Sequence, residues 1–157
     1  DAGALVPDEV IIGILKDRLA EADCANGFIL DGVPRTIAQA EAIETMGIRI
    51  DKVLELSVAD DVIVERMSGR RVCEKCGASY HILNKKSKVE GVCDCCGGKL
   101  VTRKDDQPAT VLDRLNAYHE QTEPLVEFYR QRGKLAVIPF CPSIEETTAE
   151  VMKALEA

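Results

Sequence analysis

The sequence predicts an α/β protein that carries a small, separate β insert. Three short apolar runs, at residues 28–30, 53–56 and 135–138, alternate with helical patterns, as buried parallel strands do in α/β proteins. Between residues 72 and 104 the helical period disappears, and this stretch holds five of the seven cysteines. We therefore expect a core built from residues 1–71 and 105–157, with the insert at 72–104 as a domain of its own.

Each predicted helix has a start or stop signal. Apolar residues at helical spacing predict a helix that starts at Pro7, one over residues 37–46, one that contains residues 62–67, and one that runs from Pro108 to Gly133. Pro124 is expected to interrupt or restart the last of these, because proline lacks a backbone N–H. Ser143 and Glu146 form a capping box that opens a further helix.

Composition and charge exclude some classes of function. Hydrophobic residues make up 46% of the chain and aromatic residues 4%, so packing depends on aliphatic side chains. The net charge is −7, from 20 basic and 27 acidic residues, which argues against a general nucleic-acid binder. No apolar run approaches the length of a membrane span, and the first residues lack a signal-peptide pattern. We expect no nucleic-acid partner, no membrane association and a cytoplasmic location.

Two cysteine pairs in the insert predict a four-thiolate zinc site. Cys73 and Cys76 form one CxxC motif, Cys93 and Cys96 form another, and sixteen residues lie between them. A tetrahedral ion needs four ligands, and each CxxC motif places two sulfur atoms on one tight turn. Because four protein ligands leave no open coordination position, the zinc is expected to be structural and to stabilise an insert that has little core.

The glycines decide which cysteines are ligands. Gly77 and Gly97 each follow a proposed pair, and glycine tolerates the tight backbone after such turns. This register leaves Cys95 as a spare thiol. Disulfides are the alternative, but no secretory signal supports an oxidising compartment. We expect the two cysteines outside the insert, Cys24 and Cys141, to be buried apolar residues.

Arginines lie on both sides of the insert. Arg66 and Arg70 are four residues apart, and like charges on one helical face repel by about 0.2–0.5 kcal/mol unless an anion or an acid lies between them. The guanidinium fork binds two phosphate oxygens at once. The cluster therefore indicates either a local anion site or a solvated face paired with nearby acids, and the spacing alone does not decide between them.

The stretch GFILDGVPRTIAQ, residues 27–39, predicts a ligand-binding loop at the end of a strand. The predicted strand ends in Asp31, the chain turns, and Thr36 then caps a helix with Gln39 three residues further on. Ligands of open α/β sheets bind at the carboxyl ends of strands, and Arg35 would lie beside a helix N-terminus, which attracts anions. The alternative is a simple capping box and a turn aspartate; the loop indicates a phosphate ligand.

Four motifs, in this order along the chain, resemble those of adenylate kinases. They are LVPDE (residues 5–9), GFILDGVPRT (27–36), GRRVCEKCG (69–77) and TRKDD (102–106). The cysteine-bearing insert is similar to the long lid of bacterial members. The resemblance implies a P-loop nucleoside monophosphate kinase-like fold, a parallel sheet with helices on both faces plus a zinc-binding lid. It also implies reversible phosphoryl transfer, ATP + AMP to two ADP, with magnesium, and we expect a monomer.

The resemblance implies roles for individual residues. Arg35 resembles the arginine that holds the AMP phosphate, Gln39 the glutamine that reads the adenine of AMP, and Asp31 the acid that acts on magnesium through water. The rest of the AMP site would be Leu5, Val6, Gly32, Arg103 and Arg114. The ATP site would include Arg66, which resembles the arginine stacked on the ATP adenine, together with Arg70 and Pro142. The residues implied in catalysis are Arg35, Arg70, Arg103, Arg114 and Asp31, with Asp105 and Asp106 positioning the arginines as the lid closes.

The chain departs from the family pattern in three places. Val33 stands where phenylalanine is usual, and the loop at 140–143 lies where glycine is frequent near the ATP base. The phosphate-loop pattern GxxxxGK[ST] does not occur in the 157 residues. We expect that loop, and a first strand that would lie between those at 28–30 and 53–56, to precede Asp1. The 157 residues alone are then expected to be inactive and poorly stable.

Two other functions fit part of the sequence. Another nucleoside monophosphate kinase would share most of these motifs, and only Gln39 favours AMP, so a comparison of AMP, CMP, UMP and GMP as acceptors separates the two. A non-catalytic zinc-ribbon binding module would explain the cysteines but not Arg35, Asp31 or the arginines around the insert. Such a module would bind a macromolecule in a zinc-dependent way and would itself have no affinity for nucleotides.

Overall fold

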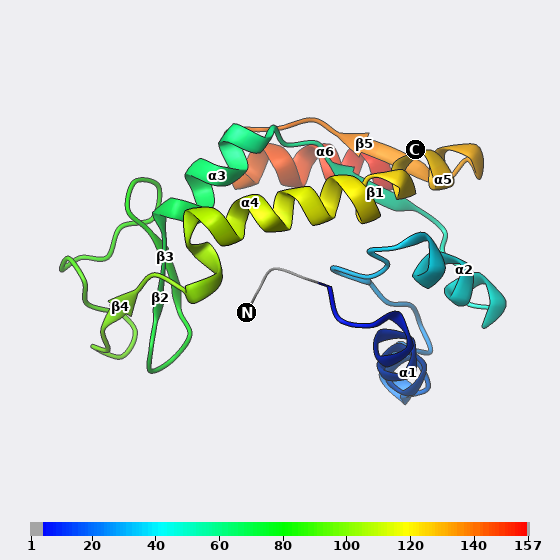
Figure 1. Ribbon diagram of the computed structural model, residues 1–157, viewed down its shortest axis with the longest axis horizontal. Coiled ribbons are helices and arrows are strands. Elements are labelled where there is room, and N and C mark those ends of the chain that lie inside the picture. The colour runs from blue at the N-terminus through cyan, green and yellow to red at the C-terminus, as the bar shows by residue number, and fades with distance from the viewer. Residues whose placement is uncertain (1–4, 157) are drawn as a thin grey trace. The chain divides into compact units, whose positions relative to one another are not determined.

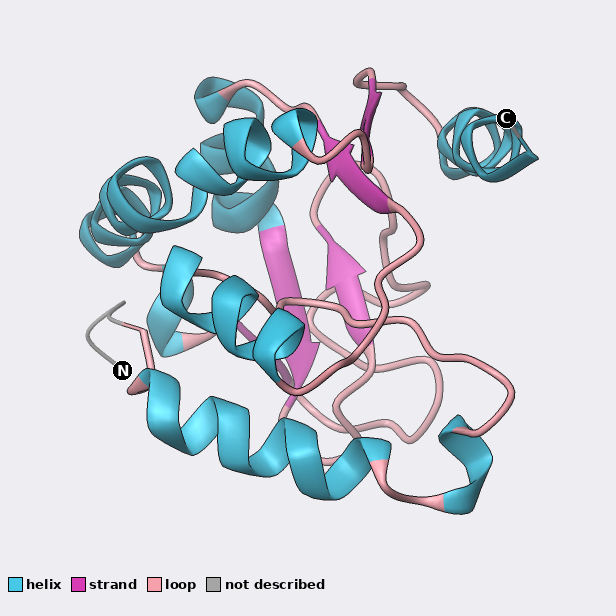
Figure 2. Ribbon diagram, turned by 90° about the vertical axis from the view of Figure 1, so that its right-hand side faces the viewer, coloured by secondary structure: helices cyan, strands magenta, loops and turns pink. Residues whose placement is uncertain are grey.

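The computed structural model describes residues 5–156, and these form two compact units. The first, here called the lid unit, contains residues 58–116. The second, here called the sheet unit, contains residues 5–57 and 117–156. Helices account for most of the regular structure in the described chain (Figure 2).

A two-stranded parallel sheet organises the sheet unit. Strand β1 (Val53–Leu56) pairs with β5 (Leu135–Ile138), from Val53 opposite Leu135 to Leu56 opposite Ile138. Helices α5 (Pro124–Gln131) and α6 (Ile144–Glu156) both pack on β5 (Figure 1). A parallel pair needs such flanking helices to cover it, and the arrangement confirms the predicted α/β class.

The apolar core of the sheet unit lies between α2 (Ile37–Thr45) and α5. Ala40 of α2 packs with Leu125 and Tyr129 of α5, and these three are at most 7% exposed. Four partly buried residues complete the cluster: Ile37, Val53, Phe128 and Leu135. Aliphatic and aromatic side chains from helix and strand thus form one contiguous core.

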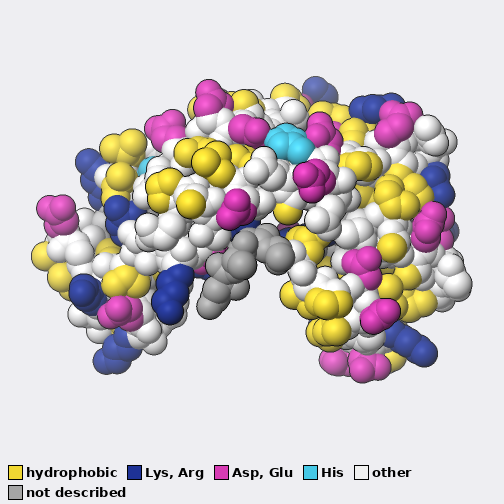
Figure 3. Space-filling view, viewed as in Figure 1, with side chains coloured by type: hydrophobic (Ala, Val, Ile, Leu, Met, Phe, Trp, Pro, Cys, Tyr) yellow, Lys and Arg dark blue, Asp and Glu magenta, His cyan; other side chains and the backbone are white. Residues whose placement is uncertain are grey.

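Helix α1 (Asp8–Leu19) packs on α2 and is followed by the short 3-10 helix η1 (Ala22–Cys24). Val10 and Ile14 of α1 are half or more exposed, and apolar side chains are visible on the surface of this helix (Figure 3). The prediction that Cys24 and Cys141 are buried is wrong, since both are only partly buried. The sulfur of Cys24 lies 3.0 Å from Nη1 of Arg18, a polar contact that apolar surroundings would not provide.

The predicted helices are confirmed, and the predicted strand at residues 28–30 is wrong. Those three residues are irregular, and Ile29 is 94% exposed. A strand is defined by its ladder of hydrogen bonds. Within residues 5–156 the two sheets take their strands from elsewhere in the chain, so 28–30 has no ladder to join.

The helix starts predicted at Pro124 and Ser143 are confirmed. Pro124 is the first residue of α5, so it restarts a helix after the π-helical turn η3 (Tyr118–Thr122). The capping box of α6 is reciprocal: the Glu146 N–H donates to Ser143 Oγ (3.1 Å), and the Ser143 N–H donates to Glu146 Oε2 (3.3 Å).

The lid unit contains the predicted small β insert. Helix α3 (Asp60–Gly69) leads directly into β2 (Arg70–Cys73), which pairs antiparallel with β3 (Ser79–His81) and with β4 (Leu100–Val101). The short 3-10 helix η2 (Lys104–Asp106) and helix α4 (Pro108–Ala117) follow. None of the helices in residues 5–156 combines the length and the apolar character that a membrane span needs.

Candidate functional site

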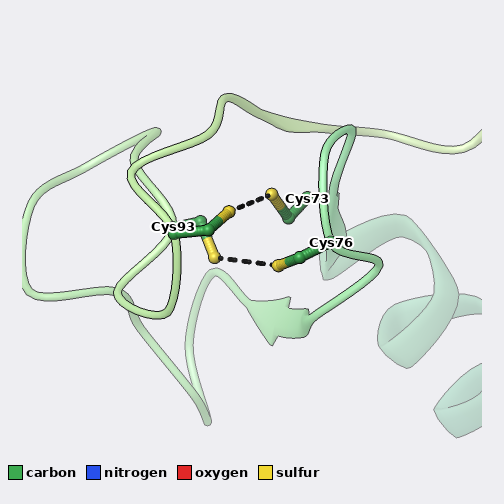
Figure 4. Close-up of side chains that lie close together, drawn as sticks. Cys73, Cys76 and Cys93 are labelled. Carbon is green, nitrogen blue, oxygen red and sulfur yellow. Dashed lines mark hydrogen bonds between the residues drawn. The ribbon is translucent and has the colours of Figure 1, made fainter.

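The lid unit brings the four predicted cysteine ligands together. The sulfur atoms of Cys73, Cys76, Cys93 and Cys96 all lie within 4.8 Å of one another, and the labelled side chains point toward a common centre (Figure 4). The Cys73–Cys96 and Cys76–Cys93 sulfur distances are 3.5 and 3.6 Å. Tetrahedral zinc with bonds of about 2.3 Å places its sulfur ligands about 3.8 Å apart. The exposed Cys95 lies outside this group, so the positions of the sulfur atoms agree with the predicted register.

Two similar turns present these sulfur atoms. The Gly77 N–H donates to the Cys73 carbonyl at 3.0 Å, and the Gly97 N–H donates to the Cys93 carbonyl at 2.9 Å. The two glycines have φ values of +74° and +69°, a backbone conformation that costs side-chain-bearing residues free energy. The glycine after each CxxC motif is therefore required by the backbone of the turn.

Gly98 is required for a different reason, which the sequence did not reveal. A Cβ atom on this residue would lie 2.8 Å from the sulfur of Cys73 and 3.3 Å from that of Cys96. Gly98 therefore lets the backbone approach the sulfur cluster directly. Its carbonyl also accepts the N–H of Cys93 at 2.8 Å, which ties the approach to the second cysteine turn.

Tyr80 is a second residue beside the cysteine cluster that spacing could not identify. Its ring is buried, and its hydroxyl lies 3.5 Å from the sulfur of Cys93 while accepting the Asp94 N–H at 2.8 Å. The hydrogen bond from Tyr80 lowers the pKa of the Cys93 thiol to about 6. The thiolate is the form that binds metal, and an all-sulfur tetrahedral set suits zinc.

Three of the predicted arginines meet two aspartates in the lid unit. Arg70 forms a two-bond ion pair with Asp106, with Nε 2.8 Å from Oδ2, and Asp106 is 1% exposed. Arg103 forms a second two-bond pair with Asp105, at 2.9 and 2.7 Å. Arg114 Nη1 lies 3.4 Å from Oδ2 of Asp105. Arg66 lies on α3, the helix that ends where β2 begins.

The charges in this arginine cluster do not balance. Asp106 raises the pKa of Arg70 through its hydrogen bond, and Arg103 holds the pKa of Asp105 below its usual range although burial acts the other way. In the ion pairs formed among the described residues of this cluster, three guanidinium groups face two carboxylates, which leaves one positive charge in excess there. Such a cluster can bind an anion, and its aspartates keep the arginines ordered in the meantime.

The loop before α2 is held by local hydrogen bonds. Gly32 adopts φ +76°, and its carbonyl accepts Nε of Arg35 at 2.9 Å. Thr36 caps α2 by accepting the Gln39 N–H at 3.2 Å, which is one half of the capping-box alternative; the Gln39 side chain accepts the N–H of Arg35, at 2.7 Å, and not that of Thr36. Asp31, Gly32 and Arg35 are exposed. The Thr36 cap and a ligand-binding role for the exposed residues are compatible.

Asp8 of α1 joins this loop, and no sequence signal indicated it. Its Oδ1 atom accepts a hydrogen bond from Thr36 Oγ1 at 3.1 Å and another from Gln39 Nε2 at 2.7 Å. Gln39 itself is 2% exposed. The remaining predicted site residues of the sheet unit are a partly buried Leu5, a half-exposed Val6, and Pro142, which is exposed in the loop between β5 and α6.

Comparison with known proteins agrees with this geometry. A family model described as adenylate kinase matches residues 1–134. The adenylate kinase of Caldicellulosiruptor bescii is 55% identical over 99% of this chain and 74% of its own length. That of Acetivibrio thermocellus is 50% identical over 99% of the chain and 73% of its own length, and that of Streptomyces griseus subsp. griseus is 49% identical over 100% and 74%.

The chain belongs to the adenylate kinase family. Members of this family are phosphotransferases that act on adenine nucleotides. The family membership predicted from the four sequence motifs is confirmed. Neither a zinc-ribbon module without catalysis nor another nucleoside monophosphate kinase is favoured by these matches.

Proposed function

We propose that the complete gene product transfers the terminal phosphoryl group of ATP to AMP and forms two molecules of ADP. Membership of the adenylate kinase family carries this proposal. The excess positive charge of the Arg70–Arg103–Arg114 cluster supports it. Phosphoryl transfer depends on positioning and on stabilising charge that spreads over phosphate oxygens, and arginines provide both.

In this proposal the arginine cluster acts on the transferred phosphoryl group. Arg70, Arg103 and Arg114 turn from their aspartates to the phosphate oxygens, and Asp105 and Asp106 hold them in order until the nucleotide arrives. Arg103 and Arg114 also contact AMP, and Arg70 also contacts ATP. Each guanidinium can donate two parallel hydrogen bonds to one phosphate, so the three side chains together would hold the phosphoryl group in place for in-line transfer.

The sheet unit supplies the other proposed AMP contacts. The exposed Arg35 holds the AMP phosphate at the N-terminus of α2, where backbone N–H groups favour negative charge. Gln39 reads the adenine, and Leu5, Val6 and Gly32 line the same site. Arg66 would stack on the ATP adenine, and Pro142 would be a further contact of ATP.

Two metals belong to the proposal. The four thiols fit zinc in number, type and spacing, and zinc would make the lid unit rigid without taking part in the reaction. Magnesium supplies charge neutralisation when it is bound with ATP, and Asp31 would act on it through water. We further propose a monomer with the nucleotides as its partners, no nucleic acid among them. We also propose a cytoplasmic location, where thiols stay reduced, and lid boundaries at 72 and 104.

A matched pair of arginine variants tests the reaction. ADP formation from ATP and AMP is measured with the complete gene product and with its Arg70→Lys and Arg71→Lys variants. Lysine keeps the charge but loses the two-bond fork, so Arg70→Lys is expected to lower kcat about 100-fold, less than the ~1,000-fold or more expected when a phosphate-clamping arginine is lost altogether. Arg71 donates to backbone carbonyls instead, and Arg71→Lys should change kcat less than about twofold.

The choice of acceptor tests the substrate. AMP should be phosphorylated in clear preference to CMP, UMP and GMP. Equal use of another acceptor would contradict AMP specificity, and the absence of ADP formation by the complete gene product would contradict the proposed reaction itself.

A further inference from the structure

The side-chain amide of Gln39 has its orientation fixed by two different neighbours. Its oxygen accepts the backbone N–H of Arg35 at 2.7 Å, and its nitrogen donates to the carboxylate of Asp8 at 2.7 Å. An N–H group can only donate and an ionised carboxylate can only accept. If the amide were reversed, two donors would face each other at one end and two acceptors at the other.

Burial makes this orientation strict. Gln39 is 2% exposed, so neither end of the amide can turn to water when its neighbour no longer matches. A buried donor or acceptor that loses its hydrogen bond keeps the full cost of its desolvation. Thr36 donates to the same oxygen of Asp8 and accepts the Gln39 N–H, which anchors the carboxylate from a second side.

We propose that Asp8 is a specificity-determining positioning residue that sets which base Gln39 accepts. The inference rests on the proposed function, in which Gln39 pairs with the adenine of AMP. With its orientation fixed, the amide offers a base one remaining N–H on Nε2 and one remaining lone pair on Oε1. Because Gln39 is nearly enclosed, a base has to displace neighbouring side chains to reach it, and the orientation is set before the base arrives.

The fixed amide matches adenine and mismatches 6-oxopurines. Adenine presents a ring-nitrogen acceptor beside an amino donor, so Nε2 can donate to the ring and Oε1 can accept from the amino group. Hypoxanthine carries an oxygen in place of that amino group and a proton on N1, which reverses the pattern. Asp8 and the Arg35 N–H prevent the Gln39 amide from reversing to match hypoxanthine. Selectivity then comes from the repulsion between the fixed amide and the mismatched base.

The experiment compares the binding of AMP and of inosine monophosphate, which differ only at these positions of the base. Dissociation constants are measured by titration calorimetry on the complete gene product and on its Asp8→Asn variant. Asparagine has the same shape but can donate as well as accept, so the reversed amide becomes acceptable at that end. We expect the Kd ratio of inosine monophosphate to AMP to fall about tenfold, because the Arg35 N–H still favours the original orientation.

Three further variants make the result specific. Asp8→Ser, whose hydroxyl also donates and accepts, should lower the ratio as well and covers the case in which Asp8→Asn does not fold. Asp8→Glu keeps an acceptor-only group and should preserve more of the ratio. Glu9→Gln removes the same charge from the adjacent exposed position and should leave the ratio unchanged.

The outcomes separate this inference from the proposed reaction. An equal loss of affinity for both nucleotides in Asp8→Asn would mean that Asp8 only fastens α1 to α2, and it would overturn the inference. An unchanged ratio, or no preference for AMP in the unaltered protein, would overturn it too. Selective AMP binding that is sensitive to Asp8 but gives no ADP would leave the inference standing while the proposed reaction fails.

Discussion

The lid unit and the sheet unit reach stability in different ways. In the sheet unit, Ala40, Leu125 and Tyr129 form an apolar core with four partly buried neighbours. The corresponding cluster around the cysteines consists of Cys73, Tyr80 and Cys93, packed with Ala78, Cys96 and Leu100. Half of that second cluster is thiol. We therefore expect apolar burial to stabilise the sheet unit and a metal ion bound by the cysteines to stabilise the lid unit.

Removing a ligand should produce the largest effect. Cys96→Ser is expected to abolish zinc binding, because the binding free energy of structural zinc, about 10–16 kcal/mol, depends on all four ligands. Elemental mass spectrometry of the purified protein measures the number of zinc ions per chain and tests this expectation. Cys95→Ser is the matched control and should keep its zinc, since Cys95 lies outside the sulfur cluster. The opposite pattern would contradict the assigned register.

Removing core volume should be the next largest effect, and it should act on the sheet unit alone. Leu125 is 7% exposed, and Leu125→Ala should lower the free energy of unfolding by about 2–5 kcal/mol because it leaves a cavity. Urea unfolding measures this, and zinc content should not change. Leu112 is 55% exposed, so Leu112→Ala should have little effect. Loss of zinc in Leu125→Ala would show that the two regions are not independent.

Crowding the sulfur cluster should have a smaller effect on the lid. In Gly98→Ala the new methyl group would lie 2.8 Å from the Cys73 sulfur, so the turn or the sulfur has to move. We expect zinc affinity, measured by competition with a chelator, to fall about 10–100-fold, as when the surroundings of other metal ligands are disturbed. Gly13 has open space around its Cα, and Gly13→Ala should leave the affinity unchanged. Equal zinc affinity in the two variants would contradict the inference that Gly98 has to be glycine because its backbone lies against the sulfur cluster.

A surface ion pair should contribute least, and its contribution should depend on pH. Arg132 pairs with Glu44 at 2.7 Å and lowers the pKa of that carboxyl. Because the folded-state pKa is the lower one, the pair stabilises the protein above the ordinary glutamate pKa of 4.5 and loses its effect as the pH falls through the folded value.

Thermal unfolding across pH tests the ion pair. Glu44→Gln should lower the melting temperature slightly at pH 7, and the difference from the unaltered protein should shrink below pH 4.5. Glu41→Gln, on the exposed side of the same helix, is the control and should show no such difference. A difference that persists at low pH would have a cause other than the carboxylate charge.

Local patterns predicted local structure well. The cysteine register followed from Gly77 and Gly97, because each CxxC turn is completed within five residues and its φ requirement is visible in the sequence. The capping box at Ser143 is similarly self-contained. Both depend on a few neighbouring residues, and distant parts of the chain cannot override them easily.

Contacts between distant residues could not be predicted in this way. Asp8 lies 31 residues before Gln39 and Tyr80 lies 13 residues before Cys93, and only the packing of α1 on α2 and of β3 beside the cysteine turns brings them together. The strand prediction for residues 28–30 is wrong for a related reason. The run is apolar, but whether it forms a strand depends on a neighbouring strand and not on its own side chains.

Hydrogen exchange with and without a chelator tests the comparison most directly. In the lid unit the Cys73, Cys93 and Leu100 N–H groups donate to backbone carbonyls, and in the sheet unit the Val53 and Ser57 N–H groups do so. Removing the metal should expose the first set to exchange while the second set stays protected, because apolar packing does not need the ion. If both sets lost protection together, or if the lid amides stayed protected without metal, the division between a metal-held lid and an apolar core would be wrong.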